Sequence, residues 1–287
     1  MADDVPTLEL RGISKSFGSV QALTEVNLSV KAGEVMALVG DNGAGKSTLI
    51  KCIAGIHPID SGQIFFEGEP VTIHGPKDSA RLGVEIVYQD LALCDNLDVV
   101  QNMYLGREAH DAVYRLREPE MERHTAETLA TLSVTTIRST RQKVATLSGG
   151  QRQSVAVARA VMWNSRLVIL DEPTAALGVA QTRQVLDLVK RLAQQKLAVV
   201  IVSHNLHDIF EVADRITVLR LGRNAGLFER TKTTPIAISA VTASCVIRLT
   251  KLIAEKKTGT LLVKYAVAMA SATITGRLPT SPAFRRP

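Results

Sequence analysis

The chain has 287 residues, of which 46% are hydrophobic, 22% charged and 4% aromatic, as in an ordinary globular enzyme. Its net charge of +6 is uneven: residues 231–287 hold nine Lys or Arg and one acid, Glu255, giving +8, which leaves −2 for residues 1–230. The main part is therefore not basic, and with so few aromatic residues we expect no nucleic-acid partner. The first four residues lack a signal-peptide pattern and the three cysteines show no pairing or metal spacing, which favours a reducing compartment.

The N-terminal region predicts a phosphate-binding loop. Two antiparallel-looking segments precede the apolar run Glu34–Val39, which we interpret as a buried strand, and a helix is expected from about Lys46 to Ala54. The loop and the helix start comprise Gly40, Asp41, Asn42, Gly43, Ala44, Gly45, Lys46, Ser47 and Thr48. Glycines let the backbone N–H groups point at phosphate oxygens, and the helix N-terminus adds a positive dipole. This pattern predicts that Lys46 reaches the β- and γ-phosphates of ATP and that Ser47 is a ligand of Mg²⁺.

The middle of the chain predicts a hairpin, a strand and a helix-rich region. The hairpin covers Gly62–Gly68, the strand Val84–Tyr88, and the helical region residues 89–164, including an amphipathic stretch at Glu120–Leu132. A second glycine-rich loop, Ser148-Gly149-Gly150-Gln151, precedes another amphipathic helix. Ser148 suits an ordinary helix N-cap, and a helix start with free N–H groups can also cradle phosphate, so the residues themselves are compatible with both roles.

Two adjacent carboxylates, Asp171 and Glu172, end the next apolar run, Leu167–Leu170. Side by side they raise each other's pKa unless a cation compensates, which makes Asp171 a candidate Mg²⁺ ligand. Glu172 is then available to activate the attacking water. A helix at Val179–Gln195 and a strand at Leu197–Val202 follow, and His204 comes after them. His204 and His207 lack the further ligands that a metal site would need.

In this order the motifs resemble the ATP-binding cassette (ABC) ATPases, from about Leu8 to Phe228. Leu147-Ser148-Gly149-Gly150-Gln151 matches the signature of that family completely. The resemblance implies an α/β fold: a P-loop nucleotide-binding core with an antiparallel β subdomain and an inserted helical subdomain, all within residues 1–230. It also implies a homodimer, in which Ser148, Gly149, Gly150 and Gln151 close over the γ-phosphate held by the partner.

The resemblance assigns three further site residues. Gln89 corresponds to the glutamine that senses Mg²⁺ and the lytic water and touches a membrane partner, and His204 to the switch histidine that holds the γ-phosphate. Phe17 corresponds to the aromatic residue that stacks on adenine; a core aromatic is the alternative interpretation. One position departs from the pattern, because Leu177-Gly178 stands where the family usually has Leu-Asp.

The segments Asp41–Leu49 and Glu172–Val179 look like those of bacterial monosaccharide importers of the ribose, xylose and fructose type. This implies Mg²⁺-dependent ATP hydrolysis that powers sugar uptake through a separate integral membrane permease, with an external sugar-binding protein. The chain would be peripheral, at the cytoplasmic face of the membrane. The alternatives are a soluble cassette acting on ribosomes or DNA, disfavoured by the single cassette without coiled coils, and a non-hydrolysing regulator, disfavoured by the complete set of motifs.

Residues 231–287 are expected to be a basic C-terminal extension of weak order. Their longest uncharged run, Thr233–Ile247, is shorter than the roughly 20 residues that a membrane-spanning helix needs. A small subdomain and a membrane-surface contact are the alternatives.

Overall fold

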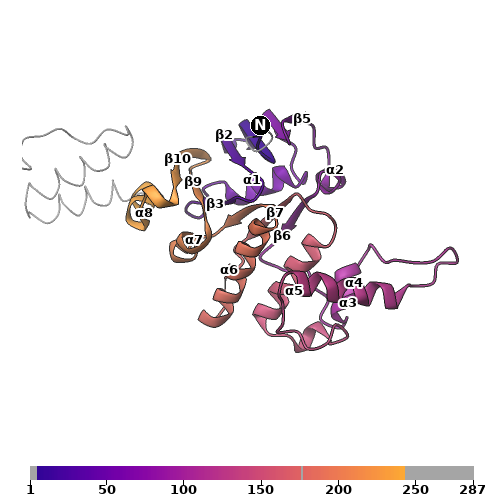
Figure 1. The fold of residues 1–287 in the computed structure, drawn as a ribbon. Helices are drawn as coiled ribbons and strands as arrows, with labels where there is room; N and C mark the ends of the chain where they lie inside the picture. Colours follow the sequence, from indigo (N-terminus) through magenta and orange to yellow (C-terminus); the bar gives the residue numbers. More distant parts are fainter. Residues whose placement is uncertain (1–4, 176, 243–287) are drawn as a thin grey trace, which may run out of the picture.

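The computed structural model describes residues 5–175 and 177–242, which form two β-sheets and a set of helices (Figure 1). Most of the predicted C-terminal extension, residues 243–287, lies outside the described residues.

The smaller sheet is antiparallel, in the order β2-β1-β4-β5. Its strands are β1 (Leu8–Phe17), β2 (Val20–Val30), β4 (Ser61–Phe66) and β5 (Glu69–Val71). The predicted hairpin is confirmed as β4 and β5, which turn through Glu67 and Gly68, both at positive φ. Inward residues of β1 and β2, such as Leu10 and Val26, pack against helix α1 (Lys46–Ile53) and one face of the larger sheet.

The larger sheet has the order β10-β9-β3-β8-β7-β6, in which every pair except the antiparallel pair β9–β10 is parallel. Its strands are β3 (Val35–Val39), β6 (Val84–Val87), β7 (Leu167–Asp171), β8 (Ala198–Val202), β9 (Arg215–Arg220) and β10 (Arg223–Glu229). The strands β3 and β8 are buried at every position, because elements cover both faces. This explains why they are continuous apolar runs without alternation.

The helices beyond the phosphate loop cover the sheet and build a separate lobe. They are α2 (Pro76–Arg81), α3 (Val99–Tyr104), α4 (Glu118–Thr131), α5 (Gly149–Val161), α6 (Val179–Gln194) and α7 (Leu206–Val212), with a 3₁₀ turn η1 (Val144–Thr146). Figure 1 shows α3, α4 and α5 together beside the sheet, as expected for an inserted helical subdomain. The connection between α3 and α4 projects away from the body in the same view. Within the described residues, no helix has the length and apolarity needed to cross a membrane.

A last helix, α8 (Pro235–Thr242), follows the 3₁₀ turn η2 (Arg230–Lys232). Its Ile238 is completely buried and belongs to the same core as Ile216 and Val218 of β9. Within the described residues, helical structure and core packing thus continue past residue 230, where the C-terminal extension was expected to begin.

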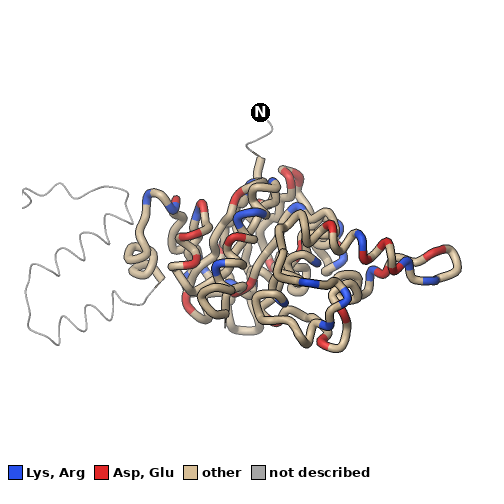
Figure 2. The backbone as a smooth tube through the Cα atoms, turned by 60° about the horizontal axis from the view of Figure 1, so that its bottom comes forward, with Lys and Arg blue, Asp and Glu red and all other residues tan. Residues whose placement is uncertain are grey.

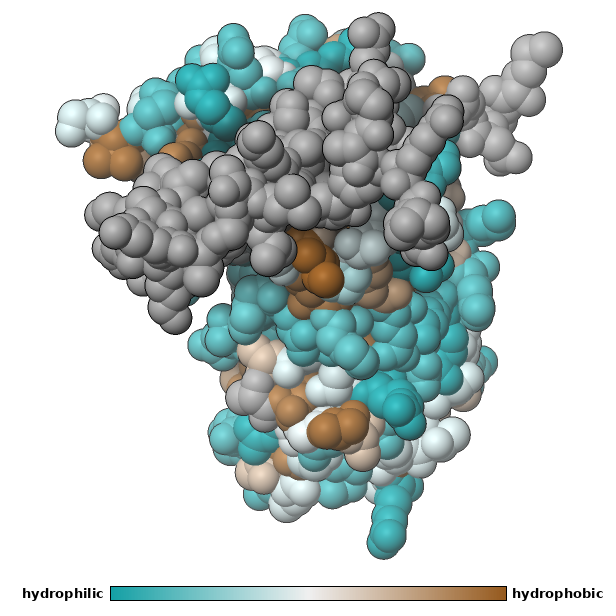
Figure 3. All heavy atoms as spheres, turned by 90° about the vertical axis from the view of Figure 1, so that its left-hand side faces the viewer, coloured by the Kyte–Doolittle hydropathy of each residue, from teal (hydrophilic) through white to brown (hydrophobic). Residues whose placement is uncertain are grey.

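Charged residues of both signs are mixed over the described surface (Figure 2), as the small net charge of residues 1–230 leads one to expect. On the face in Figure 3, the visible hydrophobic residues form separate small patches among hydrophilic ones. Figure 3 therefore shows no broad apolar surface where described residues are visible on this face.

Candidate functional site

Most of the predicted site residues follow four neighbouring strands of the larger sheet. The phosphate loop follows β3, His204 follows β8, Asp171 and Glu172 end β7, and Gln89 follows β6. These strands are adjacent in the order β3-β8-β7-β6 and run parallel, so their carboxyl ends share one edge. Ligands of open α/β sheets bind at this edge, which makes it the candidate site.

Two glycines of the phosphate loop, Gly40 and Gly45, have neighbours that leave no room for a side chain. A Cβ on Gly40 would lie 2.3 Å from the carbonyl oxygen of Leu219 on β9. Gly45 has φ +100°, and a Cβ there would lie 2.8 Å from Leu23 Cδ2. The loop therefore packs closely between the two sheets, and glycine at each end of the loop allows this close approach.

Lys46 is the first residue of α1 and is only 9% exposed. Its Nζ donates to the carbonyl oxygens of Gly40, at 2.7 Å, and Asp41, at 3.1 Å. The ammonium group thus lies across the loop, within reach of a phosphate held there. A cleft of about 360 Å³ runs along the loop. It is lined by Val20, Gln21, Ala22, Asn42, Gly43, Ala44, Gly45, Lys46, Ser47, Thr48, Leu221 and Gly222.

Five residues of this lining were not predicted from sequence: Val20, Gln21, Ala22, Leu221 and Gly222. They come from the start of β2 and from the turn between β9 and β10. Gly222 has φ +74°, and a Cβ on it would lie 2.5 Å from the carbonyl oxygen of Ala22. The turn Leu221-Gly222 was a readable signal of a tight approach, whereas the other three positions carry no local signal.

Glu172 and His204 form a pair at the ends of β7 and β8. His204 Nδ1 lies 3.0 Å from a carboxylate oxygen of Glu172, and the backbone N–H of Glu172 donates to Val202. Glu172 has φ +50°, an uncommon conformation for a residue with a side chain. Such outliers concentrate at functional sites, where surrounding structure enforces them. The predicted base and switch histidine are thus brought together.

The environment of Asp171 is one that a cation would stabilise. Burial, and then the charge of Glu172, raise the pKa of Asp171, against the opposing effect of Lys46 and Lys51. Burial, and then Asp171 itself, raise the pKa of the neighbouring Tyr88 hydroxyl. Tyr88 lies directly between β6 and Gln89, so the exposed Gln89 emerges on the same side as the two carboxylates.

The donor set fits Mg²⁺ better than a metal held by protein alone. No group of three or more His, Cys, Asp or Glu side chains could hold a metal in residues 5–175 and 177–242. Mg²⁺ usually binds one or two protein oxygens together with phosphates and water. Ser47 offers an exposed hydroxyl at the loop, and Asp171 offers a carboxylate. The raised pKa of Asp171 means that its negative charge is unfavourable without a cation nearby, which suits Mg²⁺.

The signature segment forms the start of a helix, where Ser148 and Gly149 are exposed and Gly150 is buried. Ser148 is the N-cap of α5: its Oγ accepts from the backbone N–H of Gln151, and Gln151 Oε1 accepts from the backbone N–H of Ser148. Gln151 Nε2 also donates to the carbonyl of Thr136. Ser148 and Gly149 are exposed, and none of Ser148–Gln151 lines the described clefts beside the phosphate loop of the same chain. Within the described residues, the signature segment therefore contributes to neither cleft beside its own phosphate loop.

Phe17, at the end of β1, is 44% exposed, which is more than a core aromatic would be. The rings of Phe17 and His57 are nearly perpendicular with centroids 5.0 Å apart, and Lys15 Nζ lies 5.5 Å from the Phe17 centroid. Lys15 is paired with Asp60 at 2.7 Å. The bonds from Lys15 and then Ser16 lower the pKa of Asp60 to about 2. The Phe17 ring is thus packed by His57 and Lys15 of the same part of the chain, while part of the side chain is exposed to solvent.

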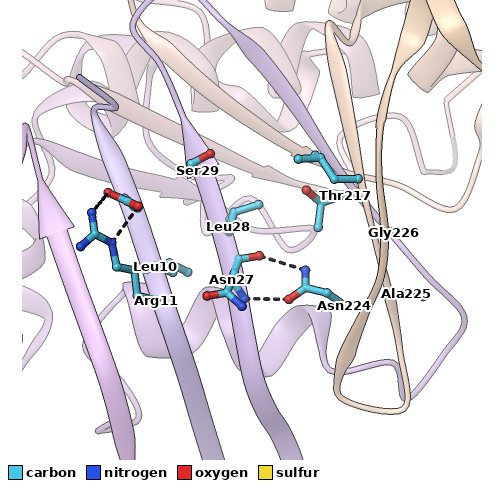
Figure 4. A pocket seen from close by; sticks show the side chains of 11 residues that line it. Leu10, Arg11, Asn27, Leu28, Ser29, Thr217, Asn224, Ala225 and Gly226 are labelled. Carbon is cyan, nitrogen blue, oxygen red and sulfur yellow. Dashed lines mark hydrogen bonds and ion pairs between the residues drawn. The ribbon is translucent and has the colours of Figure 1, made fainter. Parts of the chain in front are cut away.

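Two other clefts differ from the one along the phosphate loop, and predicted site residues also line the first of them. One of about 310 Å³ lies between the phosphate loop, His204 and α8, whose Ser239 and Thr242 line it. The other, of about 410 Å³, separates β1 and β2 from β9 and β10 (Figure 4). In that cleft Asn224 accepts from the backbone N–H of Asn27 and donates to its carbonyl, and Arg11 pairs with Glu9. These polar groups bind one another, so although this cleft is larger, the chemistry points to the phosphate loop.

Comparison with known proteins agrees with this geometry. The family model described as "ABC transporter" matches residues 23–175. A xylose/arabinose import ATP-binding protein of Sulfolobus acidocaldarius is 47% identical over 216 residues, covering 75% of this chain and 85% of the relative. A fructose import ATP-binding protein of Rhizobium meliloti is 45% identical, covering 76% and 86%. A ribose import ATP-binding protein of Yersinia pestis is 41% identical and is covered over 44% of its length.

Solved structures match the same fold. A nucleotide-free ATP-binding cassette from an ABC transporter superposes with a TM-score of 0.70 at 27% identity, covering 78% of this chain and 91% of that one. A dimeric post-hydrolysis state of the cassette MJ0796, bound to ADP and Pi, gives a TM-score of 0.65 at 25% identity, covering 78% and 98%. The predicted fold class is thereby confirmed.

Proposed function

This chain belongs to the ABC transporter family, and from that premise we propose that it is the ATP-hydrolysing subunit of a monosaccharide importer. The observation that carries the hydrolytic part is the meeting of Lys46, Glu172, His204 and Gln89 at one edge of the sheet. The observation that supports a sugar as cargo is the identity of 47% and 45% to import proteins whose names specify xylose or arabinose, and fructose.

In the proposed mechanism the phosphate loop binds ATP through its backbone N–H groups and the N-terminus of α1. Lys46 exchanges its contacts with the carbonyls of Gly40 and Asp41 for the β- and γ-phosphates. Phe17 supports the adenine. Mg²⁺, held by Ser47 and Asp171 with Gln89 beside it, would neutralise charge on the transferred phosphoryl group.

Glu172 is the proposed base, because its carboxylate is partly buried at the strand end and is oriented by His204. It accepts a proton from the attacking water, and His204 holds the γ-phosphate in place. Proton transfer of this kind typically contributes 10²–10⁴-fold in rate, so about 10²-fold is the minimum loss expected without it.

The exposed signature segment completes the proposed site in a second copy. Ser148 and Gly149 are exposed and line neither cleft beside their own phosphate loop, so they are free to face the nucleotide that a partner holds. Two copies meeting in this way would form two composite sites. We therefore propose a homodimer that hydrolyses ATP only when closed.

Sugar movement needs further subunits. We propose that the dimer docks at the cytoplasmic face of the membrane on integral permease subunits, through the surface beside Gln89 and residues 90–96, and that an external binding protein delivers the sugar. A ribosome- or DNA-directed function is less well supported, because the named relatives are import proteins.

Deletion of the gene tests this proposal. Uptake of one monosaccharide should stop, and a Glu172→Gln copy expressed at the parent level should fail to restore it. Uptake that is unchanged across a panel of pentoses and hexoses, with a defect for another solute, would reject the sugar assignment and keep the importer. A chain found bound to ribosomes without a membrane partner would reject both.

A further inference from the structure

Asp208 is a buried carboxyl group for which the hydrolysis mechanism has no use. It is the third residue of α7 and only 3% exposed. Its Oδ2 accepts a hydrogen bond of 2.7 Å from the hydroxyl of Thr174, which is itself 9% exposed. The neighbouring ionisable group is the exposed His207, whose Nδ1 lies 3.8 Å from Oδ1. A buried hydrogen bond of this kind is costly to leave half made, so it fixes the distance between its two segments.

This bond joins the two segments that follow Glu172 and His204, which together form the hydrolytic pair. Thr174 lies two residues after Glu172, in the connection from β7 to α6. Asp208 lies four residues after His204, and Asn205, between them, is the N-cap of α7. The bond therefore holds the connection that leaves Glu172 against the helix that begins beside His204.

The same connection contacts the signature segment. A Cβ on Gly149 would lie 3.0 Å from Leu177 Cδ2, and one on Gly150 would lie 3.1 Å from Gln181 Cβ. Gln181 Oε1 also accepts from the backbone N–H of Gly178. Leu177 and Gln181 thus sit directly against the start of α5, where the two glycines leave room for them.

Because residue 178 is glycine, the connection depends more on Thr174 for a side chain that holds it in place. The family resemblance leads one to expect an aspartate at that position, but glycine supplies no side chain to anchor the connection at the α6 end. Thr174 supplies a buried side-chain anchor at the β7 end instead.

We propose that the hydrogen bond between Thr174 and Asp208 positions Leu177 and Gln181, and so links the hydrolytic pair of one copy to the signature segment that this copy presents to its partner. Thr174 and Asp208 are positioning residues. The inference rests on the proposed function, because it requires composite sites. It predicts an effect in trans: a change at Thr174 impairs hydrolysis of the ATP held by the other copy.

A heterodimer with one working site measures that effect. A Lys46→Ala chain keeps its signature segment but loses its phosphate loop, and a Ser148→Arg chain does the reverse. Each alone should be inactive, whereas their mixture holds one composite site. Thr174→Val, which keeps the shape and removes the hydroxyl, is then added to the Lys46→Ala chain only. Thr174→Ser, which keeps the hydroxyl, is the matched control, and Asp208→Asn removes the charge but keeps an acceptor oxygen.

We expect Thr174→Val in the signature-donating chain to lower kcat of the mixture about tenfold, the effect of about 1.4 kcal/mol. The KM for ATP should change little, because the ATP-holding chain is untouched. Thr174→Ser should restore most of the activity. Heat unfolding of the Thr174→Val chain checks that it is folded.

The outcomes distinguish a failure of the inference about Thr174 and Asp208 from a failure of the composite-site proposal. Unchanged kcat with Thr174→Val in the signature-donating chain overturns the inference and leaves the composite site standing. Equal losses from Thr174→Val and Thr174→Ser overturn it too, because the hydroxyl would then be irrelevant. If the parent mixture is inactive although both chains are folded, the composite-site proposal fails, and the inference with it.

Discussion

Gly45 and Gly43 of the phosphate loop offer a matched pair of substitutions. Both have left-handed backbone, at φ +100° and +79°. A Cβ on Gly45 would meet Leu23 Cδ2 at 2.8 Å and the carbonyl oxygen of Ala22 at 2.9 Å. A Cβ on Gly43 would meet nothing within 4 Å. The two alanine variants therefore share the backbone penalty and differ in packing.

The expected magnitudes follow from these contacts. Placing an alanine in left-handed backbone costs roughly 1–2 kcal/mol, and both variants carry this cost. Overpacking against fixed neighbours costs roughly 1–3 kcal/mol more, and only Gly45→Ala carries it because a backbone oxygen cannot rotate away. We expect Gly45→Ala to be less stable than Gly43→Ala by about 1–3 kcal/mol.

Urea unfolding of both variants without nucleotide measures this difference. The midpoint of Gly45→Ala should be lower at an unchanged slope, because the folded state alone is affected. Its ATP affinity should fall as well, since relief of the contact with Ala22 shifts the loop. Equal midpoints for the two variants would refute the claim that the loop is wedged between the sheets.

Three further predictions concern single site residues. Glu172→Gln should bind ATP, lose at least ~10²-fold in turnover and accumulate as a dimer by gel filtration with ATP; parent-like turnover would place the base elsewhere. Asp171→Asn should raise the unfolding temperature at neutral pH. Burial and Glu172 raise the pKa of Asp171 above its ordinary value of 3.8, so the folded parent loses stability as pH rises from about 3.8 to that raised pKa. The higher unfolding temperature of Asp171→Asn should disappear at acidic pH. A difference in unfolding temperature that does not depend on pH would contradict a raised pKa at Asp171. Phe17→Ala should weaken ATP binding by roughly 1–3 kcal/mol in calorimetry but leave inorganic triphosphate binding unchanged, and equal losses for both would exclude adenine stacking.

Sequence predicted best where a single element carries the signal. The strands Val35–Val39 and Leu167–Asp171 are buried on both faces, so their continuous apolar runs predicted them correctly. The glycines after β3 predicted the loop. The helices starting at Lys46 and Val179 were likewise found to within a residue or two. Local composition decides these elements.

Features that depend on distant segments were not predicted. The bond of Thr174 to Asp208 spans 34 positions, and the contact of Gly222 with Ala22 joins the two sheets. Thr174 and Asp208 are unremarkable in their own segments. The turn at Gly222 signals a tight approach but does not indicate that Ala22 lies opposite it. The packing of Ile238 depends on a distant segment in the same way, because Ile238 is buried in one core with residues of β9, a strand that ends at Arg220.

The central claim is that the signature segment of one copy completes the ATP site of another. Turnover per chain, measured over a series of protein concentrations with the dimer fraction determined by sedimentation, tests this most directly. The account predicts that turnover per chain rises in proportion to the dimer fraction and approaches zero in dilute samples. Full turnover from a sample shown to be monomeric would contradict it.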